Sequence, residues 1–133
     1  MKFNAGKCHV LHLGHGNVNQ NYYMKDQNST DMQQLDSTQE EKDLGVLVDN
    51  ELSFAKHIAA QVSKANRLVG QIRRSFSYLD KDMMKQLFIA LVRPHLEFGN
   101  VVWAPHHKKY IDMIRKGAKK GNKMYTRHAR QNI

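Results

Sequence analysis

The apolar residues in the middle of the chain predict a long amphipathic helix over residues 54–78. They recur at alternating intervals of four and three residues, which is the spacing of one face of an α-helix. The members of this face are Ile58, Val62, Ala65, Val69, Ile72 and Phe76. Ser53 is the expected N-cap, and Gly70 weakens the helix by about 1 kcal/mol relative to Ala without ending it. A continuous apolar face indicates that this helix packs against a partner helix.

A second helix is expected to begin after Asp80, whose side chain can cap the first turn. Its apolar face consists of Met84, Leu87, Phe88, Leu91 and Val92. Pro94 lacks a backbone donor and would distort the helix near Arg93. Apolar residues continue beyond the proline, so the pattern favours a kink over a stop. We expect Phe98 and Trp103 to pack in the core, and a third helix to follow Pro105.

The first part of the chain has a different pattern, with short apolar runs between polar stretches. Residues 8–13 and 46–48 are typical of strands, and residues 22–24 predict a further brief strand. The rest of residues 17–41 is rich in Asn, Gln, Ser, Thr and Asp, which predicts an extended loop. Gly45 indicates a bulge or a close approach beside the strand at 46–48.

Composition and charge limit the class of protein. The chain has 133 residues, 41% of them hydrophobic, which suits one modest domain. Its formal net charge is +9, and residues 108–133 alone hold nine Lys or Arg against Asp112. Such a basic stretch gains affinity for phosphate backbones by releasing counterions, without reading sequence. The alternative interpretation is a solvated tail that binds polyanions weakly.

The same composition indicates an intracellular protein, nuclear or cytoplasmic. One cysteine excludes an internal disulfide framework and fits a reducing compartment. No apolar run approaches the ~20 residues that span a membrane, and the residues after Met1 do not resemble a signal peptide.

Three histidines near the start, His9, His12 and His15, raise the possibility of a metal-dependent hydrolase. On a strand, His9 and His12 would point to opposite faces, because side chains alternate with a period of two. Adding Cys8 does not improve this geometry, and the sequence holds no second Cys or His pair at a zinc spacing. We therefore expect no metal site here.

Four motifs carry a family resemblance. Residues 3–14 read FNAGKCHVLHLG, residues 42–46 KDLGV, residues 64–76 KANRLVGQIRRSF and residues 91–105 LVRPHLEFGNVVWAP. In this order the chain resembles the C-terminal palm and thumb of the reverse transcriptase of LINE-type (jockey-like) non-LTR retrotransposons. The last motif is the most specific, because many low-frequency residues fall at fixed spacing. The resemblance extends over residues 3–124, and departs from the family pattern at residues 115–118.

The resemblance implies an α+β fold, in which a small antiparallel sheet is followed by a mostly helical thumb of about three helices. The sheet is the end of a polymerase palm together with a primer-grip hairpin. The implied division is residues 1–52 for the palm end with its polar loop, 53–116 for the helical thumb, and 117–133 for a basic, disordered tail.

It also implies that the chain holds RNA or an RNA–DNA duplex with low sequence specificity. Duplexes of this kind are bound mainly through phosphates and groove shape. The candidate binding residues are Lys42, Lys64, Arg67, Arg73, Arg74, Arg93, Lys108 and Lys109. Lys7 occupies the position of a lysine implicated as proton donor to pyrophosphate, a role that stays latent without a bound substrate phosphate.

The catalytic carboxylates of an RNA-directed DNA polymerase are not recognisable in the sequence. The family holds Mg²⁺ with Asp residues of an upstream strand and of an aromatic–small–Asp–Asp turn, whereas Asp31, Asp36, Asp43 and Asp49 are scattered. We expect no catalysis and no cofactor in this chain alone, since a full enzyme needs the fingers and the front of the palm. The alternatives are a non-catalytic basic nucleic-acid-binding or adaptor protein, or a degenerate remnant without function.

Overall fold

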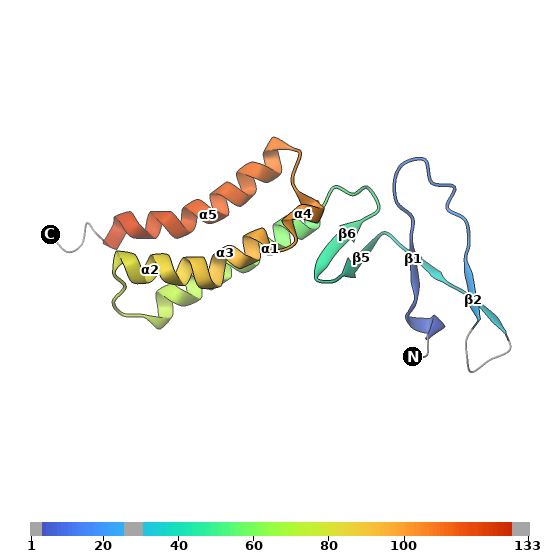
Figure 1. Ribbon diagram of the computed structural model, residues 1–133, viewed down its shortest axis with the longest axis horizontal. Helices are drawn as coiled ribbons and strands as arrows, with labels where there is room; N and C mark the ends of the chain where they lie inside the picture. Colours follow the sequence, from blue (N-terminus) through green and yellow to red (C-terminus); the bar gives the residue numbers. More distant parts are fainter. Residues whose placement is uncertain (1–3, 26–30, 129–133) are drawn as a thin grey trace. The chain divides into compact units, whose positions relative to one another are not determined.

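The computed structural model describes residues 4–25 and 31–128, and they form two separate units. The chain divides between Phe54 and Ala55, two residues beyond the boundary that the sequence predicted. The first unit contains strands and the second contains helices (Figure 1). The α+β class predicted from the sequence is therefore confirmed.

The strands of the first unit form three separate pairs instead of the single antiparallel sheet that was expected. The pairs are β1 (His9–Leu11) with β4 (Asp36–Thr38), β2 (Tyr23–Lys25) with β3 (Met32–Gln34), and β5 (Glu40–Asp43) with β6 (Val46–Asp49). The first pair is parallel and the other two are antiparallel. The strands β3 and β4 lie where the sequence predicted a loop. Strand pairing uses backbone groups, which polar residues also supply, so the lack of apolar alternation concealed them.

The β5–β6 hairpin is closed by Leu44 and Gly45. Both have positive φ angles, +45° and +88°, as in the type I′ turns that suit the twist of two-residue hairpins. Glycine adopts this conformation without a side-chain clash, which explains Gly45 better than the bulge considered from the sequence. Val46, the first residue after the turn, is buried.

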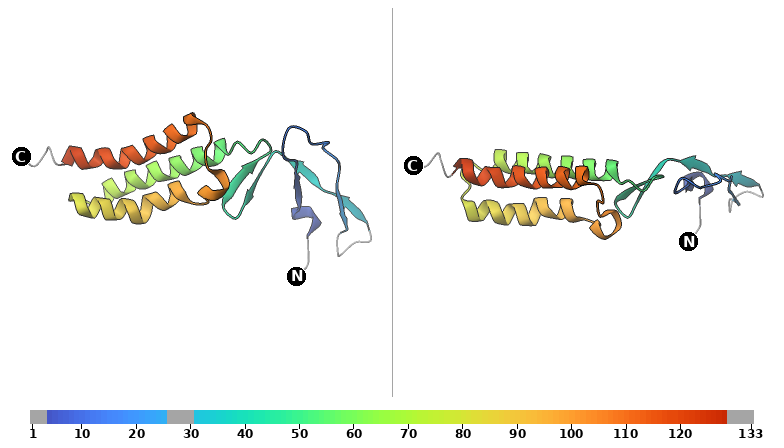
Figure 2. Two further views of the ribbon diagram at one scale, coloured as in Figure 1. Left: turned by 45° about the horizontal axis from the view of Figure 1, so that its top comes forward. Right: turned by 90° about the horizontal axis from the view of Figure 1, so that it is seen from above.

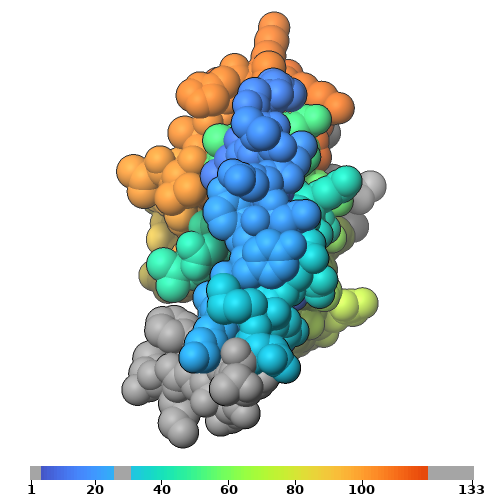
Figure 3. Space-filling model, turned by 90° about the vertical axis from the view of Figure 1, so that its right-hand side faces the viewer, coloured from blue at the N-terminus to red at the C-terminus, as the bar shows by residue number. Residues whose placement is uncertain are grey.

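The segment between β1 and β2 is exposed beyond His12. Every residue from 13 to 23 belongs to the exposed class, and atoms of this part of the chain, in blue, lie at the surface in Figure 3. Local hydrogen bonds order its start, where Asn17 Nδ2 donates to the Leu13 carbonyl at 3.3 Å and Asn17 Oδ1 lies 3.1 Å from His12 Nδ1. This part of the predicted polar loop is a surface loop.

The second unit is a three-helix bundle, as predicted. Its elements are α1 (Ala55–Ser75), α2 (Lys81–Leu87), the π-helical η2 (Phe88–Val92), α3 (Arg93–Glu97), α4 (Asn100–Trp103) and α5 (Lys108–His128). The succession α2–η2–α3 forms one continuous rod that runs opposite to α1, and α5 then runs parallel to α1 (Figures 1 and 2). Asp80 caps α2 as expected, accepting a hydrogen bond of 2.7 Å from the amide of Met83.

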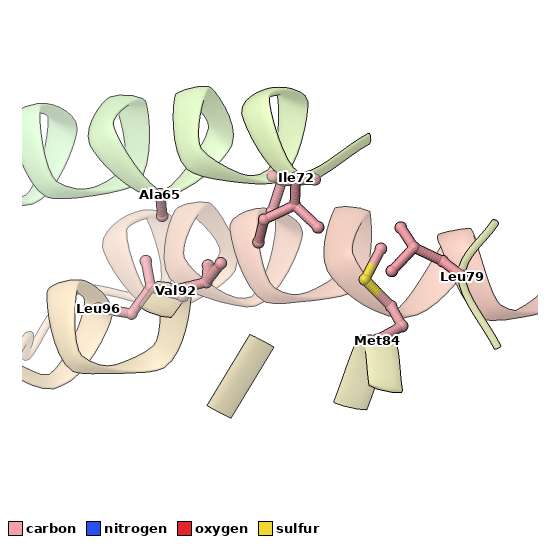
Figure 4. Close-up of a cluster of buried hydrophobic side chains, with 7 residues drawn as sticks. Ala65, Ile72, Leu79, Met84, Val92 and Leu96 are labelled. Carbon is pink, nitrogen blue, oxygen red and sulfur yellow. The ribbon is translucent and has the colours of Figure 1, made fainter. Parts of the chain in front are cut away.

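Apolar side chains from α1, the connection before α2 and the α2–α3 rod form the core of the bundle (Figure 4). Its buried members are Ala65, Val69, Ile72, Leu79, Met84, Val92 and Leu96. The prediction that Phe76 and Leu91 belong to the buried faces is wrong, because Phe76 is 42% exposed and Leu91 is 45% exposed. Phe76 follows the last residue of α1, so it leaves the helical face.

The π-helical segment before Pro94 explains why Leu91 is exposed although the sequence predicted it to be buried. The amide of Arg93 donates to the carbonyl of Phe88, five residues earlier, where an α-helix would use the fourth. This wider turn changes the directions of the side chains around it, and of the two predicted neighbours only Val92 is buried, whereas Leu91 is exposed. The helix thus continues past Pro94, as expected, and the distortion takes the form of a π-helical turn.

Trp103 anchors the corner between α3 and α5. Its side chain is 2% exposed, its Nε1 donates to the Phe98 carbonyl at 2.6 Å, and its ring centroid lies 5.4 Å from that of His57. Burial lowers the pKa of His57, which favours the neutral imidazole. Trp103 is a core residue as predicted, whereas Phe98 is 51% exposed and contributes its carbonyl instead of its ring. Gly99, with φ of +67°, makes the turn between them.

Helix α5 continues to His128, although the sequence predicted a disordered tail from residue 117. Gly117 is buried, and a Cβ atom there would lie 3.3 Å from Cγ1 of Val62 on α1. The missing side chain therefore allows α5 to approach α1 closely, and this packing outweighs the low helix propensity of glycine. Residues 129–133 of the predicted tail lie outside the described residues.

Candidate nucleic-acid interface

Charge is divided unequally between the two units. Residues 1–54 contain four Lys or Arg and eight Asp or Glu, a formal net charge of −4. Residues 55–133 contain seventeen Lys or Arg and four Asp or Glu, a formal net charge of +13. The sequence alone placed the positive charge mainly after residue 107. The division into units shows that the whole helical bundle is basic.

On α1, Arg67 and Arg74 share the outer face of the helix. Each follows a buried core residue, Ala65 or Ile72, by two positions, which turns it about 200° away from the core. They are separated by two turns, so both are exposed on one stripe. Arg73 lies about 100° from Arg74 around the same helix, and so points away from that stripe.

Lys64 borders the same stripe on the side of α3. It lies about 60° from Arg67 by helical geometry and is exposed. Burial and, secondly, the nearby charge of Lys64 lower the pKa of His95, which places Lys64 near α3. The structure thus brings Lys64, Arg67 and Arg74 together and separates Arg73 from them.

Helix α5 presents a second basic face. Lys108 and Lys119 lie about 180° and 200° from the buried Gly117, so both face away from the bundle. Lys116 is also exposed on this side, and the Nζ atom of Lys109 lies 5.9 Å from the Tyr110 ring centroid. The first turn of α5 contains no acidic residue, so the positive end of its dipole adds to the two lysines there.

Other residues in the predicted set do not join these two faces. Arg93 is on α3, where its Nε lies 2.7 Å from Oε1 of Glu97, so its charge is already compensated. Lys42 and Lys7 belong to the first unit and are exposed, Lys42 on β5 opposite Leu47 and Lys7 at the end of the 3-10 helix η1 (Ala5–Lys7).

Two exposed lysines of α2, Lys81 and Lys85, were not predicted as functional residues. They lie four residues apart, in the same row as Arg93. This spacing was visible in the sequence. That the row lines a groove together with residues of α5 is visible only in the structure.

The described residues contain no group of three or more His, Cys, Asp or Glu side chains placed to hold a metal ion. His9 instead pairs with Glu41, with 2.9 Å between Nδ1 and Oε1. Within the same part of the chain, none of the helices is both long enough and apolar enough to cross a membrane.

Comparison with known proteins finds a partial similarity to a nematode protein. A Caenorhabditis elegans protein named Uncharacterized protein B0403.1 is 31% identical to this chain over 72 residues. The matched part is 54% of this chain and 36% of the relative, so the chain spans about a third of that protein's length. No protein-family model matches the chain, and no solved structure matches it.

Proposed function

We propose that the chain is the palm-end and thumb portion of an RNA-directed DNA polymerase from a LINE-type (jockey-like) non-LTR retrotransposon. In this proposal the helical unit holds RNA or an RNA–DNA duplex with low sequence specificity. The β5–β6 hairpin with Lys42 corresponds to the primer grip, and Lys7 to the latent proton donor. Catalysis, and the Mg²⁺ that the family enzyme uses, belong to a larger polymerase chain.

The observation that carries this proposal is the concentration of cations on the helical unit, seventeen against four acids. A nucleic-acid duplex carries about one negative charge per 1.7 Å of its axis, as in B-DNA. Arg67 and Arg74 are about 10 Å apart along α1, a spacing at which each meets a separate phosphate of the duplex. Contacts of this kind give affinity and position without reading bases, which matches the expected low sequence specificity.

The positive end of α5 supports the same proposal. Lys108 and Lys109 begin a 21-residue helix with no acidic residue in the first turn. Cations at this end of a helix are electrostatically unfavourable in the isolated protein. A bound phosphate removes that repulsion and is attracted by the same helix terminus.

The experiment measures binding of the full chain to a fluorescein-labelled 20-bp RNA–DNA duplex at a series of NaCl concentrations. We expect Arg67→Ala/Arg74→Ala to weaken binding and to lower the slope of log K against log salt by about 2, one for each phosphate contact. Replacing Lys108, Lys116 and Lys119 by Gln is also expected to weaken binding and to lower the salt slope. Both sets preserve the fold better than removing α5, which packs on α1.

The matched control is Lys81→Ala/Lys85→Ala, which removes the same charge from α2. We expect this variant to keep the salt slope of the original chain. An equal loss in the control and in the α1 variant would mean that net charge alone, and no particular face, governs binding, and the proposal would be wrong.

A further inference from the structure

A groove of about 590 Å³ lies between the α2–α3 rod and α5 in the helical unit. Phe88, Ile89 and Leu96 line it from the rod, and Ile114 and Ala118 line it from α5. Its volume falls within the usual range of ligand-binding sites, ~300–1,000 Å³. The floor of this groove is therefore apolar, although the unit around it is strongly basic.

One edge of the groove is a regular row on the α2–α3 rod. Lys81, Lys85, Ile89, Arg93 and Glu97 follow one another at intervals of four residues, and all five line the groove. At a rise of 1.5 Å per residue the row extends over about 24 Å. Glu97 already binds Arg93, so the net positive charge of the row comes from Lys81 and Lys85.

The π-helical segment η2 lies in the middle of this row. Its wider turn buries Val92 completely and leaves Ile89 46% exposed above the groove. Interruptions of this type are frequent at functional sites, because they change the direction of the side chains around them. Ile89 is therefore an apolar side chain that lines the groove and stays exposed, instead of packing in the core.

We propose that this groove binds an acidic amphipathic helix of a partner protein. The apolar face of that helix lies on Phe88, Ile89 and Ile114, and its acidic side chains face Lys81 and Lys85. The row of about 24 Å matches a helix of about 16 residues. Docking of an amphipathic helix into a groove between helices is a recurrent mode of peptide recognition.

The apolar floor favours this occupant over nucleic acid. A phosphate placed against Phe88, Ile89 and Leu96 would lose its hydration without gaining a hydrogen bond, which is costly. Leucine-like side chains at the same position would lower the free energy of binding, because their apolar surface leaves water. Duplex binding is assigned instead to the outer faces of α1 and α5, so the two proposals involve different residues.

The test uses fluorescence anisotropy with the full chain and a fluorescein-labelled 17-residue peptide. The peptide has Leu at intervals of three and four and Glu at the other positions, and a second peptide has the same composition in scrambled order. We expect saturable binding of the amphipathic peptide, with the scrambled peptide weaker by about tenfold or more.

Substitutions in the groove distinguish docking from general attraction between charges. We expect Ile89→Asp to weaken peptide binding about tenfold, and Lys81→Glu/Lys85→Glu to do the same. The controls are Val101→Asp, at a residue 93% exposed outside the groove, and Arg67→Glu on α1, each expected to stay within about twofold. Ile89 is exposed, so its replacement should leave the fold intact; if circular dichroism shows unfolding, the lysine variant still provides the test.

Three results would overturn the proposal. Equal binding of the scrambled peptide would show that only charge is recognised. An equal loss in Val101→Asp would show that the groove is not the binding site. Displacement of the peptide by the RNA–DNA duplex, with a larger effect of Lys81→Glu/Lys85→Glu on the duplex, would make the groove a nucleic-acid surface. The Arg67→Ala/Arg74→Ala variant, tested on both ligands, separates failure of this proposal from failure of duplex binding.

Discussion

At the residue scale, the carboxylate of Asp49 organises the turn that follows β6. Its Oδ1 accepts hydrogen bonds from the amides of Glu51 at 3.1 Å and Ser53 at 2.9 Å. Its Oδ2 accepts from the amide of Phe54 at 2.7 Å and from the Ser53 hydroxyl at 3.2 Å. Partial burial alone would raise the pKa of Asp49, but these donors outweigh it and hold the pKa below its ordinary value. The ionised form is thus bound within the turn.

We expect Asp49→Asn to lower the free energy of unfolding at pH 7 by about 1 kcal/mol, as for a lost cap. The folded-state pKa is lowered, so the unfolded chain takes up the proton first as the pH falls. The stabilisation is therefore present above the ordinary pKa of 3.8 and is lost as the pH falls through the folded-state value. Urea unfolding of both proteins between pH 7 and pH 2 should show the difference shrinking toward zero.

The control for this prediction is Asp36→Asn, at an exposed residue of β4. It should leave the free energy of unfolding at pH 7 nearly unchanged. If the difference between Asp49→Asn and the original chain stayed constant down to pH 2, the bound carboxylate would not be its origin.

At the element scale, the glycines of the two long helices differ in their surroundings. A Cβ atom at Gly70 on α1 meets nothing within 4 Å. A Cβ atom at Gly117 on α5 meets Val62 at 3.3 Å and Leu96 at 3.8 Å. The first glycine therefore only weakens its helix, whereas the second is required by the contact between α5 and the other helices.

We expect Gly70→Ala to raise the free energy of unfolding by about 0.5–1 kcal/mol, through helix propensity and reduced freedom of the unfolded chain. Gly117→Val should lower it by about 1–3 kcal/mol, because the larger side chain overpacks the interface. Thermal unfolding followed by circular dichroism at 222 nm measures both. A Gly117→Val protein as stable as the original chain would mean that α5 does not pack on α1 in solution.

The same elements show where sequence patterns succeed. The buried residues of α1 recur at regular helical spacing, so Ile58, Ala65, Val69 and Ile72 were predicted correctly. Past Phe88 the same reasoning selected both Leu91 and Val92, and the structure buries only Val92. A period of 3.6 residues does not anticipate a π-helical turn, whose extra residue is accommodated only by packing in three dimensions.

At the scale of the whole molecule, the helical unit with its net charge of +13 repels itself. Raising NaCl from 50 to 500 mM shortens the Debye length from about 14 Å to about 4 Å. We expect the melting temperature of the helical unit to rise by a few degrees over this range. Calorimetry measures the change, and the fluorescence of Trp103, which belongs to this unit, identifies the transition.

The variant with Gln at Lys108, Lys116 and Lys119 is the comparison for this prediction. It should melt at a higher temperature than the original chain at 50 mM NaCl and respond less to added salt. A melting temperature independent of salt in the original chain would show that its cations are already compensated in the folded state.

The sequence by itself determined that strands precede helices, and it determined the position of α1, the helix after Asp80 and the cap at Asp80. These features depend on local spacing and on one side chain near its own backbone, which a linear pattern records. It also located the Lys and Arg residues along the chain, because the position of a charged residue is read directly from the sequence.

Only the tertiary structure decided the rest. The pairing of β1 with β4, the burial of Gly117 and the separation of Arg73 from Arg74 depend on which segments meet in space. The groove between the α2–α3 rod and α5 also requires residues far apart in the sequence, such as Phe88 and Ile114. Contacts of this kind follow from the simultaneous packing of several elements, and no single stretch of the chain contains that information.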